Sequence, residues 1–97
     1  SHADRLATIR EVYEKTGGLI DTHTADAVKV ARSMIKPDIP MIVLETALPI
    51  KFAETVKTAV GFEPPLTSAQ ADMMALPQRV TQIAPSVERV KAIVTAG

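Results

Sequence analysis

The sequence predicts a helix-rich fragment of an α/β protein, with the element order ααβααβα. Residues 39–44 are apolar without interruption and rich in β-branched side chains, which is typical of a strand buried on both faces, as in a parallel sheet. The stretches on either side carry apolar residues at helical spacing, bounded by capping residues, glycines and prolines. A doubly buried strand needs neighbours, and residues 80–83 supply one other candidate. We therefore expect the remaining strands to lie upstream in a longer parent protein.

Two helices are expected before this strand. The first covers residues 4–16, with Asp4 as its N-cap and Gly17 after its last turn. The second follows Asp21, which can cap it, and ends before Pro37. The apolar stripe of the second helix consists of Ala27, Val28, Ala31, Met34 and Ile35.

Three helices are expected after the strand. A turn over residues 45–48 leads to Pro49, which suits the first position of a helix, and Gly61 ends that helix. Beyond a proline-containing connection, a short helix precedes Pro77. The second candidate strand comes next, and a last helix follows its N-cap at Ser86.

Composition excludes several classes of protein. The 97 residues make one domain, 1–97, or a part of one, and the 46% hydrophobic fraction is too high for a disordered chain. The formal net charge is zero, which argues against nucleic-acid and anionic-membrane partners. The chain contains no cysteine and only two distant histidines, so no metal site is expected. With no apolar run long enough to span a membrane, we expect a soluble, cytoplasmic protein.

Thr46 is the first candidate site residue. It follows the expected strand directly, and ligands of open α/β sheets bind at the carboxyl ends of the strands. Its hydroxyl could donate a hydrogen bond to a ligand or accept one from it. Alternatively, the hydroxyl satisfies backbone groups within a strand-to-helix turn, as threonines in turns often do.

Asp21 and His23 form the second candidate pair. They stand two residues apart at the start of the second helix, where the carboxylate could orient the imidazole for acid–base chemistry. The alternative is a histidine that is solvated or bonded to the backbone. His2 is expected to belong to a disordered tail.

Two stretches of the chain resemble sequence motifs of one enzyme family. Residues 16–25, TGGLIDTHTA, are similar to TGYLIDPHTA, and residues 40–52, PMIVLETALPIKF, are similar to PMVVLATAHPAKF. Both motifs belong to the C-terminal third of threonine synthase, in the long form found in bacteria and fungi. The resemblance covers essentially the whole chain, including the closing helix around residues 87–91.

The chain departs from these motifs at a few positions. Thr22 stands in place of proline, Gly18 in place of an aromatic residue and Glu45 in place of a small one. Leu48 stands where the family commonly has histidine, and Ile50 where it has alanine. Any polar role of that histidine is absent here.

The resemblance implies the function of a fold-type II pyridoxal-phosphate enzyme. Such a lyase of amino-acid biosynthesis converts O-phospho-L-homoserine and water to threonine and phosphate. Thr46 matches the hydroxyl residue that faces the pyridine nitrogen of the cofactor, pyridoxal phosphate. Asp21 and His23 match a loop bordering the same site, with no role assigned to either.

The Schiff-base lysine of the family lies in an AFKD-like stretch, and no lysine of this chain has those neighbours. We therefore expect no catalytic residue in this segment and no activity from the chain alone. Its partners would be the upstream part of the same polypeptide and the substrate, and the isolated fragment is expected to self-associate. Two alternatives remain open: another fold-type II lyase or dehydratase, and a non-catalytic interaction or oligomerisation domain.

Overall fold

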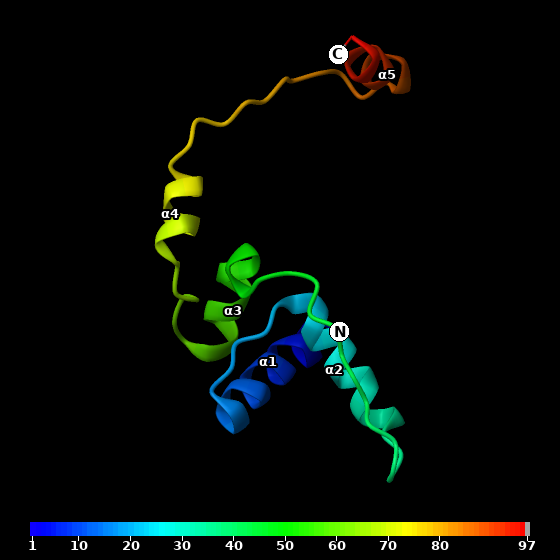
Figure 1. Cartoon of the computed structure of the whole chain (residues 1–97), viewed down its shortest axis with the longest axis vertical. Coiled ribbons are helices and arrows are strands. Elements are labelled where there is room, and N and C mark those ends of the chain that lie inside the picture. The colour runs from blue at the N-terminus through cyan, green and yellow to red at the C-terminus, as the bar shows by residue number, and fades with distance from the viewer. Residues whose placement is uncertain (97) are drawn as a thin grey trace. The chain divides into compact units, whose positions relative to one another are not determined.

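The computed structural model describes residues 1–96, and the chain divides into two compact units, one ending at Thr67 and one beginning at Ser68. The first unit contains helices α1 (His2–Thr16) and α2 (Thr22–Met34), the 3-10 helix η1 (Pro49–Phe52) and helix α3 (Ala53–Val60). The second contains helices α4 (Ser68–Met74) and α5 (Val87–Thr95) (Figure 1). The expected helices are thus confirmed.

Helix α1 begins earlier than the sequence predicted. Ser1 is its N-cap, and the Ser1 hydroxyl accepts a hydrogen bond from the Asp4 backbone N–H at 3.2 Å. The Asp4 carboxylate in turn accepts from the Ser1 amino group at 2.9 Å, which completes a capping box. The prediction of Asp4 as N-cap is therefore wrong, and His2 is helical and not part of a disordered tail. Gly17 ends the helix as predicted, with a φ of 71° that glycine adopts without steric cost.

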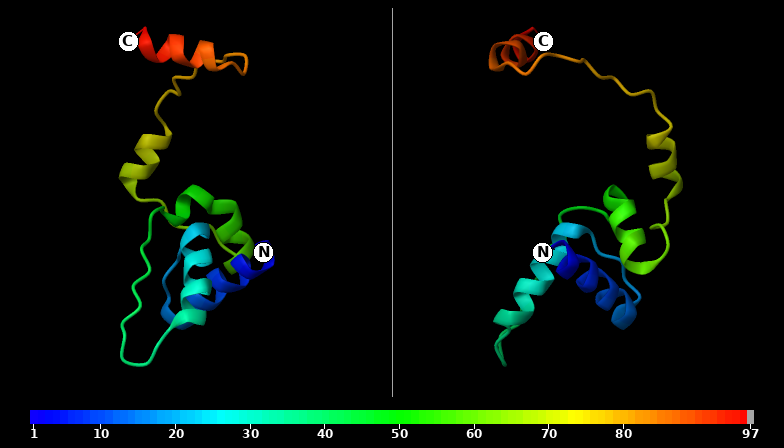
Figure 2. Two further views of the ribbon diagram at one scale, coloured as in Figure 1. Left: turned by 90° about the vertical axis from the view of Figure 1, so that its right-hand side faces the viewer. Right: turned by 180° about the vertical axis from the view of Figure 1, so that it is seen from behind.

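The core of the first unit lies where α1 packs against α2 and α3 (Figure 2). One residue from each helix is buried at its centre: Ile9, Ala25 and Ala59. The side chains packed around this cluster are Leu6, Ile20 and Val60. The predicted stripe of α2 is not part of this core, because Ala27, Met34 and Ile35 are exposed and Val28 and Ala31 are only half-buried.

Polar contacts also join these helices. Three ion pairs connect α1 with α2: Asp4–Lys29, Arg5–Asp26 and Glu11–Arg32. Arg5 Nε donates to Asp26 Oδ1 at 3.0 Å, and a second contact joins the same two side chains. Arg10 Nε donates to the Ala59 carbonyl oxygen at 2.7 Å, so α1 also holds the last turn of α3.

Neither predicted strand is found among residues 1–96, so the order ααβααβα is wrong at both β positions. Residues 40–46 are extended, but the only bridge in the described chain joins Lys36 and Ile39 within a tight turn. Ile42 is 80% exposed and Leu44 75% exposed, which contradicts the expected burial of residues 41–44. A strand needs a second backbone edge for its ladder of hydrogen bonds, and residues 1–96 place none beside this segment.

The second unit consists of two short helices and extended chain. Ser86 caps α5 as predicted, its hydroxyl accepting from the Arg89 backbone N–H at 3.3 Å. The apolar side chains of α5 are exposed, and Met73 and Met74 of α4 are exposed as well. Residues 80–83 form no strand. None of the helices within residues 1–96 combines the length and hydropathy that a membrane crossing requires.

Candidate functional site

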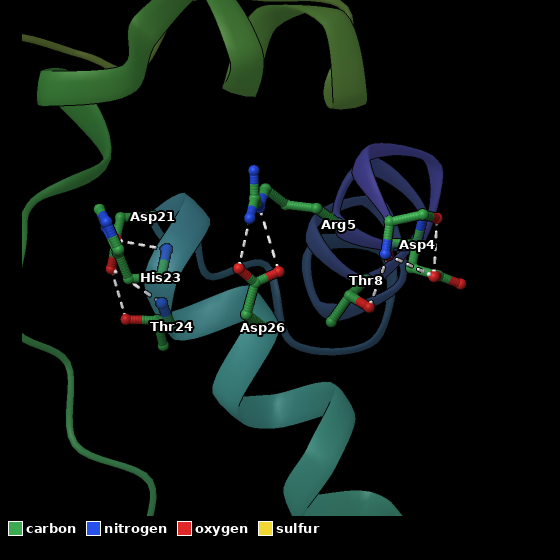
Figure 3. A network of polar contacts seen from close by, with 8 residues as sticks. Asp4, Arg5, Thr8, Asp21, His23, Thr24 and Asp26 are labelled. Atoms are coloured by element: carbon green, nitrogen blue, oxygen red, sulfur yellow. Dashed lines mark hydrogen bonds and ion pairs between the residues drawn. The ribbon is translucent and has the colours of Figure 1, made fainter.

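Asp21 organises the start of α2. It is fully buried, and its Oδ1 atom accepts a hydrogen bond from the His23 backbone N–H at 2.8 Å. Its Oδ2 atom accepts from both the backbone N–H and the side-chain hydroxyl of Thr24. Figure 3 shows the three side chains gathered at this helix end. Asp21 is therefore the N-cap that the sequence predicted, with both carboxylate oxygens engaged.

The ionisation of Asp21 follows from two opposing effects. Burial favours the neutral acid, but hydrogen bonds from the Thr24 hydroxyl, the His23 backbone and the His23 ring outweigh it and lower the pKa of Asp21 below its ordinary value. The N-terminal end of the helix dipole also favours negative charge at this position. The site thus contains a buried carboxylate that is ionised at neutral pH.

The imidazole of His23 bridges Asp21 to another part of the chain. Its Nδ1 atom lies 3.1 Å from Asp21 Oδ1. A carboxylate only accepts hydrogen bonds, so we assign the proton to Nδ1, which leaves Nε2 of a neutral ring as an acceptor. The ring also contacts Phe52 in a T-shaped arrangement, with centroids 5.0 Å apart and planes inclined by 68°. The His23 side chain nevertheless remains 64% exposed.

Thr46 lies at the end of the extended segment and is exposed. It lines a surface hollow of about 260 Å³, together with Glu45, Ala47, Leu48 and Lys51. Among residues 1–96, its hydroxyl makes no hydrogen bond.

The two predicted sites are connected through Phe52. The chain runs from Thr46 into η1, which begins at Pro49 and ends at Phe52, and Phe52 meets the His23 ring. The sequence placed Phe52 on the apolar stripe of the helix that ends at Gly61 and within the second motif, but it indicated no role at a site for Phe52 or for Thr24. Phe52 could have been found as one of only three aromatic residues in the chain.

The site residues carry hydroxyl, carboxylate, imidazole and ammonium groups. No group of three or more histidine, aspartate or glutamate side chains within residues 1–96 is arranged to hold a metal ion. The hollow itself is lined by the neutral Thr46 and by the charged residues Glu45 and Lys51, together with Ala47 and Leu48.

Comparisons of the sequence and of the structure with known proteins all lead to the same family. Residues 24–94 match the family model described as "Threonine synthase, C-terminal". Threonine synthase of Corynebacterium glutamicum is 45% identical over 92 residues, which cover 94% of this chain and 19% of that protein. Threonine synthase of Methylobacillus glycogenes is 44% identical over 79 residues, covering 81% of this chain and 17% of that protein.

A solved structure is also similar. The crystal structure of pyridoxal-phosphate-bound threonine synthase from Brucella melitensis matches with a TM-score of 0.81 and 38% sequence identity. The match covers 98% of this chain and 20% of that one, so it includes the extended segments as well as the helices. The chain therefore spans about a fifth of the length of these relatives.

Proposed function

This chain belongs to the threonine synthase C-terminal family, and from that premise we propose that it is the C-terminal part of a threonine synthase. The parent enzyme would convert O-phospho-L-homoserine and water to L-threonine and phosphate, using pyridoxal phosphate. The observation that carries the proposal is the match of residues 24–94 to the family model, which contains the whole second motif around Thr46. The named relatives are themselves threonine synthases.

We assign to Thr46 the hydrogen bond to the pyridine nitrogen of the cofactor. The fit rests on this structure: the hydroxyl lies on a hollow and has no partner among residues 1–96. When bound, pyridoxal phosphate supplies an electron sink for carbanion chemistry. A neutral hydroxyl does not hold the ring nitrogen protonated as a carboxylate would. Thr46 would therefore orient the ring and also limit how strongly the ring withdraws electrons.

We propose that the rest of the catalytic machinery comes from the upstream part of the same polypeptide. No lysine of this chain lies in an AFKD-like stretch, so the Schiff-base lysine would come from that part. The exposed apolar segment 41–44 would contact it as well. This chain alone would then bind no substrate productively and show no activity.

The first prediction tests Thr46 in the full-length enzyme. Replacing Thr46 with alanine should weaken cofactor binding and lower turnover by about one to two decades. The reason is that a buried acceptor left without its hydrogen bond costs about 1–3 kcal/mol, and 1.4 kcal/mol corresponds to a factor of ten. Thr46→Ser should recover most of the loss, because it restores the hydroxyl and removes only a methyl group.

The assignment of Thr46 is tested by measuring three quantities for both variants: the cofactor dissociation constant, the turnover and the melting temperature. A purely structural threonine would lower the melting temperature and leave turnover per folded molecule unchanged. If Thr46→Ala shows that pattern, the assignment of Thr46 to the cofactor is wrong.

A further inference from the structure

We propose that Asp21 and His23 are positioning residues, which hold Phe52 and, through Phe52, the turn that carries Thr46. The proposal rests on the proposed function, because it is the cofactor contact of Thr46 that this positioning would serve. It gives a role to two residues that the motif comparison left without one. Neither residue needs to touch the cofactor or the substrate.

The chain of contacts begins at a rigid point. Asp21 is fully buried and accepts hydrogen bonds from two backbone N–H groups of its own helix. That helix is anchored to α1 by Ala25, which is buried in the core beside Ile9. The Asp21 carboxylate therefore has a fixed position relative to the core of the first unit.

His23 connects this fixed carboxylate to Phe52. An exposed side chain normally samples several rotamers, and the His23 side chain is 64% exposed. Its ring is restrained on two sides, by the 3.1 Å contact of Nδ1 with Asp21 Oδ1 and by the contact with Phe52. The T-shaped geometry is one that aromatic pairs prefer, because the positive edge of one ring meets the negative face of the other.

The turn that receives this contact has little support of its own. Helix η1 begins without a side-chain cap, and a backbone hydrogen bond from Lys51 N–H to the Leu48 carbonyl oxygen, 3.1 Å long, closes its turn. Thr46 and Leu48 are exposed. Phe52, at the end of η1, contacts α2 through His23. Loss of that contact should leave the turn free to shift, and a ligand-binding group displaced by about 1 Å loses much of its effect.

The test uses variants of the full-length enzyme that separate the contacts. His23→Leu removes both the Nδ1 contact and the aromatic pair at similar size, whereas Asp21→Ser keeps a helix cap but is too short to restrain the ring. Phe52→Leu removes the aromatic pair from the other side. The matched control is Asp26→Asn. Asp26 lies on the same helix as His23, and its replacement breaks the ion pair with Arg5 of α1 without touching Phe52.

The dissociation constant of pyridoxal phosphate for the apoenzyme is the main measurement, with melting temperature, kcat and KM beside it. His23→Leu, Asp21→Ser and Phe52→Leu should each raise the dissociation constant by about three- to tenfold, the range expected for an aromatic pair. The double variant His23→Leu/Phe52→Leu should bind no more weakly than Phe52→Leu alone, because both changes break one contact. Asp26→Asn should lower the melting temperature and leave the dissociation constant unchanged.

Three results would overturn the positioning role. Additive effects in the double variant would mean that His23 and Phe52 act separately. An equal rise in the dissociation constant for Asp26→Asn would show a general loss of stability. A loss of kcat in His23→Leu with unchanged cofactor binding would make His23 a catalytic residue. Thr46→Ala separates this inference from the proposed function: if it weakens cofactor binding while His23→Leu does not, only the positioning role fails.

Discussion

At the scale of single residues, Asp21 shows how a local rule and a buried environment act together. An aspartate before a helix is a common N-cap, and the sequence alone predicted it. Its complete burial, however, makes each of its hydrogen bonds necessary, because an unpaired buried carboxylate would be costly. Asp21 therefore contributes to stability through the start of α2 and not through a long-range ion pair.

We expect Asp21→Ala to weaken the start of α2 by about 1–2 kcal/mol, the loss typical of an N-cap. Hydrogen exchange of the peptide spanning residues 21–28 should accelerate in this variant of the full-length protein, while exchange in α1 changes less. Asp21→Asn is the control, because an amide oxygen can still cap the helix. Equal acceleration in Asp21→Asn would show that charge, not capping, is what matters.

The same residue predicts a pH dependence. The folded state lowers the pKa of Asp21. The ionised carboxylate therefore stabilises the helix at pH values above the pKa of the unfolded state, which is about 3.9. This stabilisation is lost as the pH falls through the lower pKa of the folded state. Exchange of residues 21–28 should therefore accelerate, beyond the intrinsic effect of pH, below about pH 4. The pH dependence should be weaker in Asp21→Asn.

At the scale of elements, α1 is joined to α2 by two kinds of contact with different strengths. The three ion pairs are partly exposed, and exposed ion pairs contribute little because solvent and salt screen them. Ile9, by contrast, is completely buried against both other helices of the core. Apolar burial therefore dominates the packing of these helices, and the ion pairs add a smaller contribution.

We expect Ile9→Ala to destabilise the first unit by about 2–5 kcal/mol, as for other large-to-small changes in cores. Asp26→Asn should cost a small fraction of that, and its effect should shrink further in 1 M salt. Urea unfolding followed by helical circular dichroism can compare the two. An Asp26→Asn loss equal to that of Ile9→Ala would show that the ion pairs, and not the core, hold α1 on α2.

At the scale of the whole molecule, each of the two units leaves large apolar side chains exposed. In the first unit they include Met41, Ile42 and Leu44 of the extended segment. In the second unit they lie along α5, at Val87, Val90, Ile93 and Val94.

We therefore expect the isolated 97-residue chain to dimerise or aggregate, because it leaves an apolar, extended segment uncovered. Sedimentation velocity over a range of concentrations should show this. Ile42→Lys should reduce the association, since Ile42 is 80% exposed. Ala7→Lys, which places the same charge at an exposed position of α1, should not. A clean monomer at high concentration would contradict the expectation.

The sequence by itself determined the features that depend on near neighbours in the chain. The caps at Asp21 and Ser86 and the helix ends at Gly17 and Gly61 follow from hydrogen bonds and backbone preferences within a few residues. The two motifs around Asp21 and Thr46 likewise indicated the family through their residues and spacing alone. Such features do not require knowledge of what packs against them.

Only the tertiary structure decided the features that depend on distant parts of the chain. An apolar stretch such as 41–44 favours a strand, but a strand forms only where a second edge is supplied, and residues 1–96 supply none. The face that α2 buries is likewise set by α1, which packs on Ala25 and leaves Met34 exposed. The contact between His23 and Phe52 joins residues from two separate motifs, and no local rule could predict it, because it arises only when α2 and η1 are brought together.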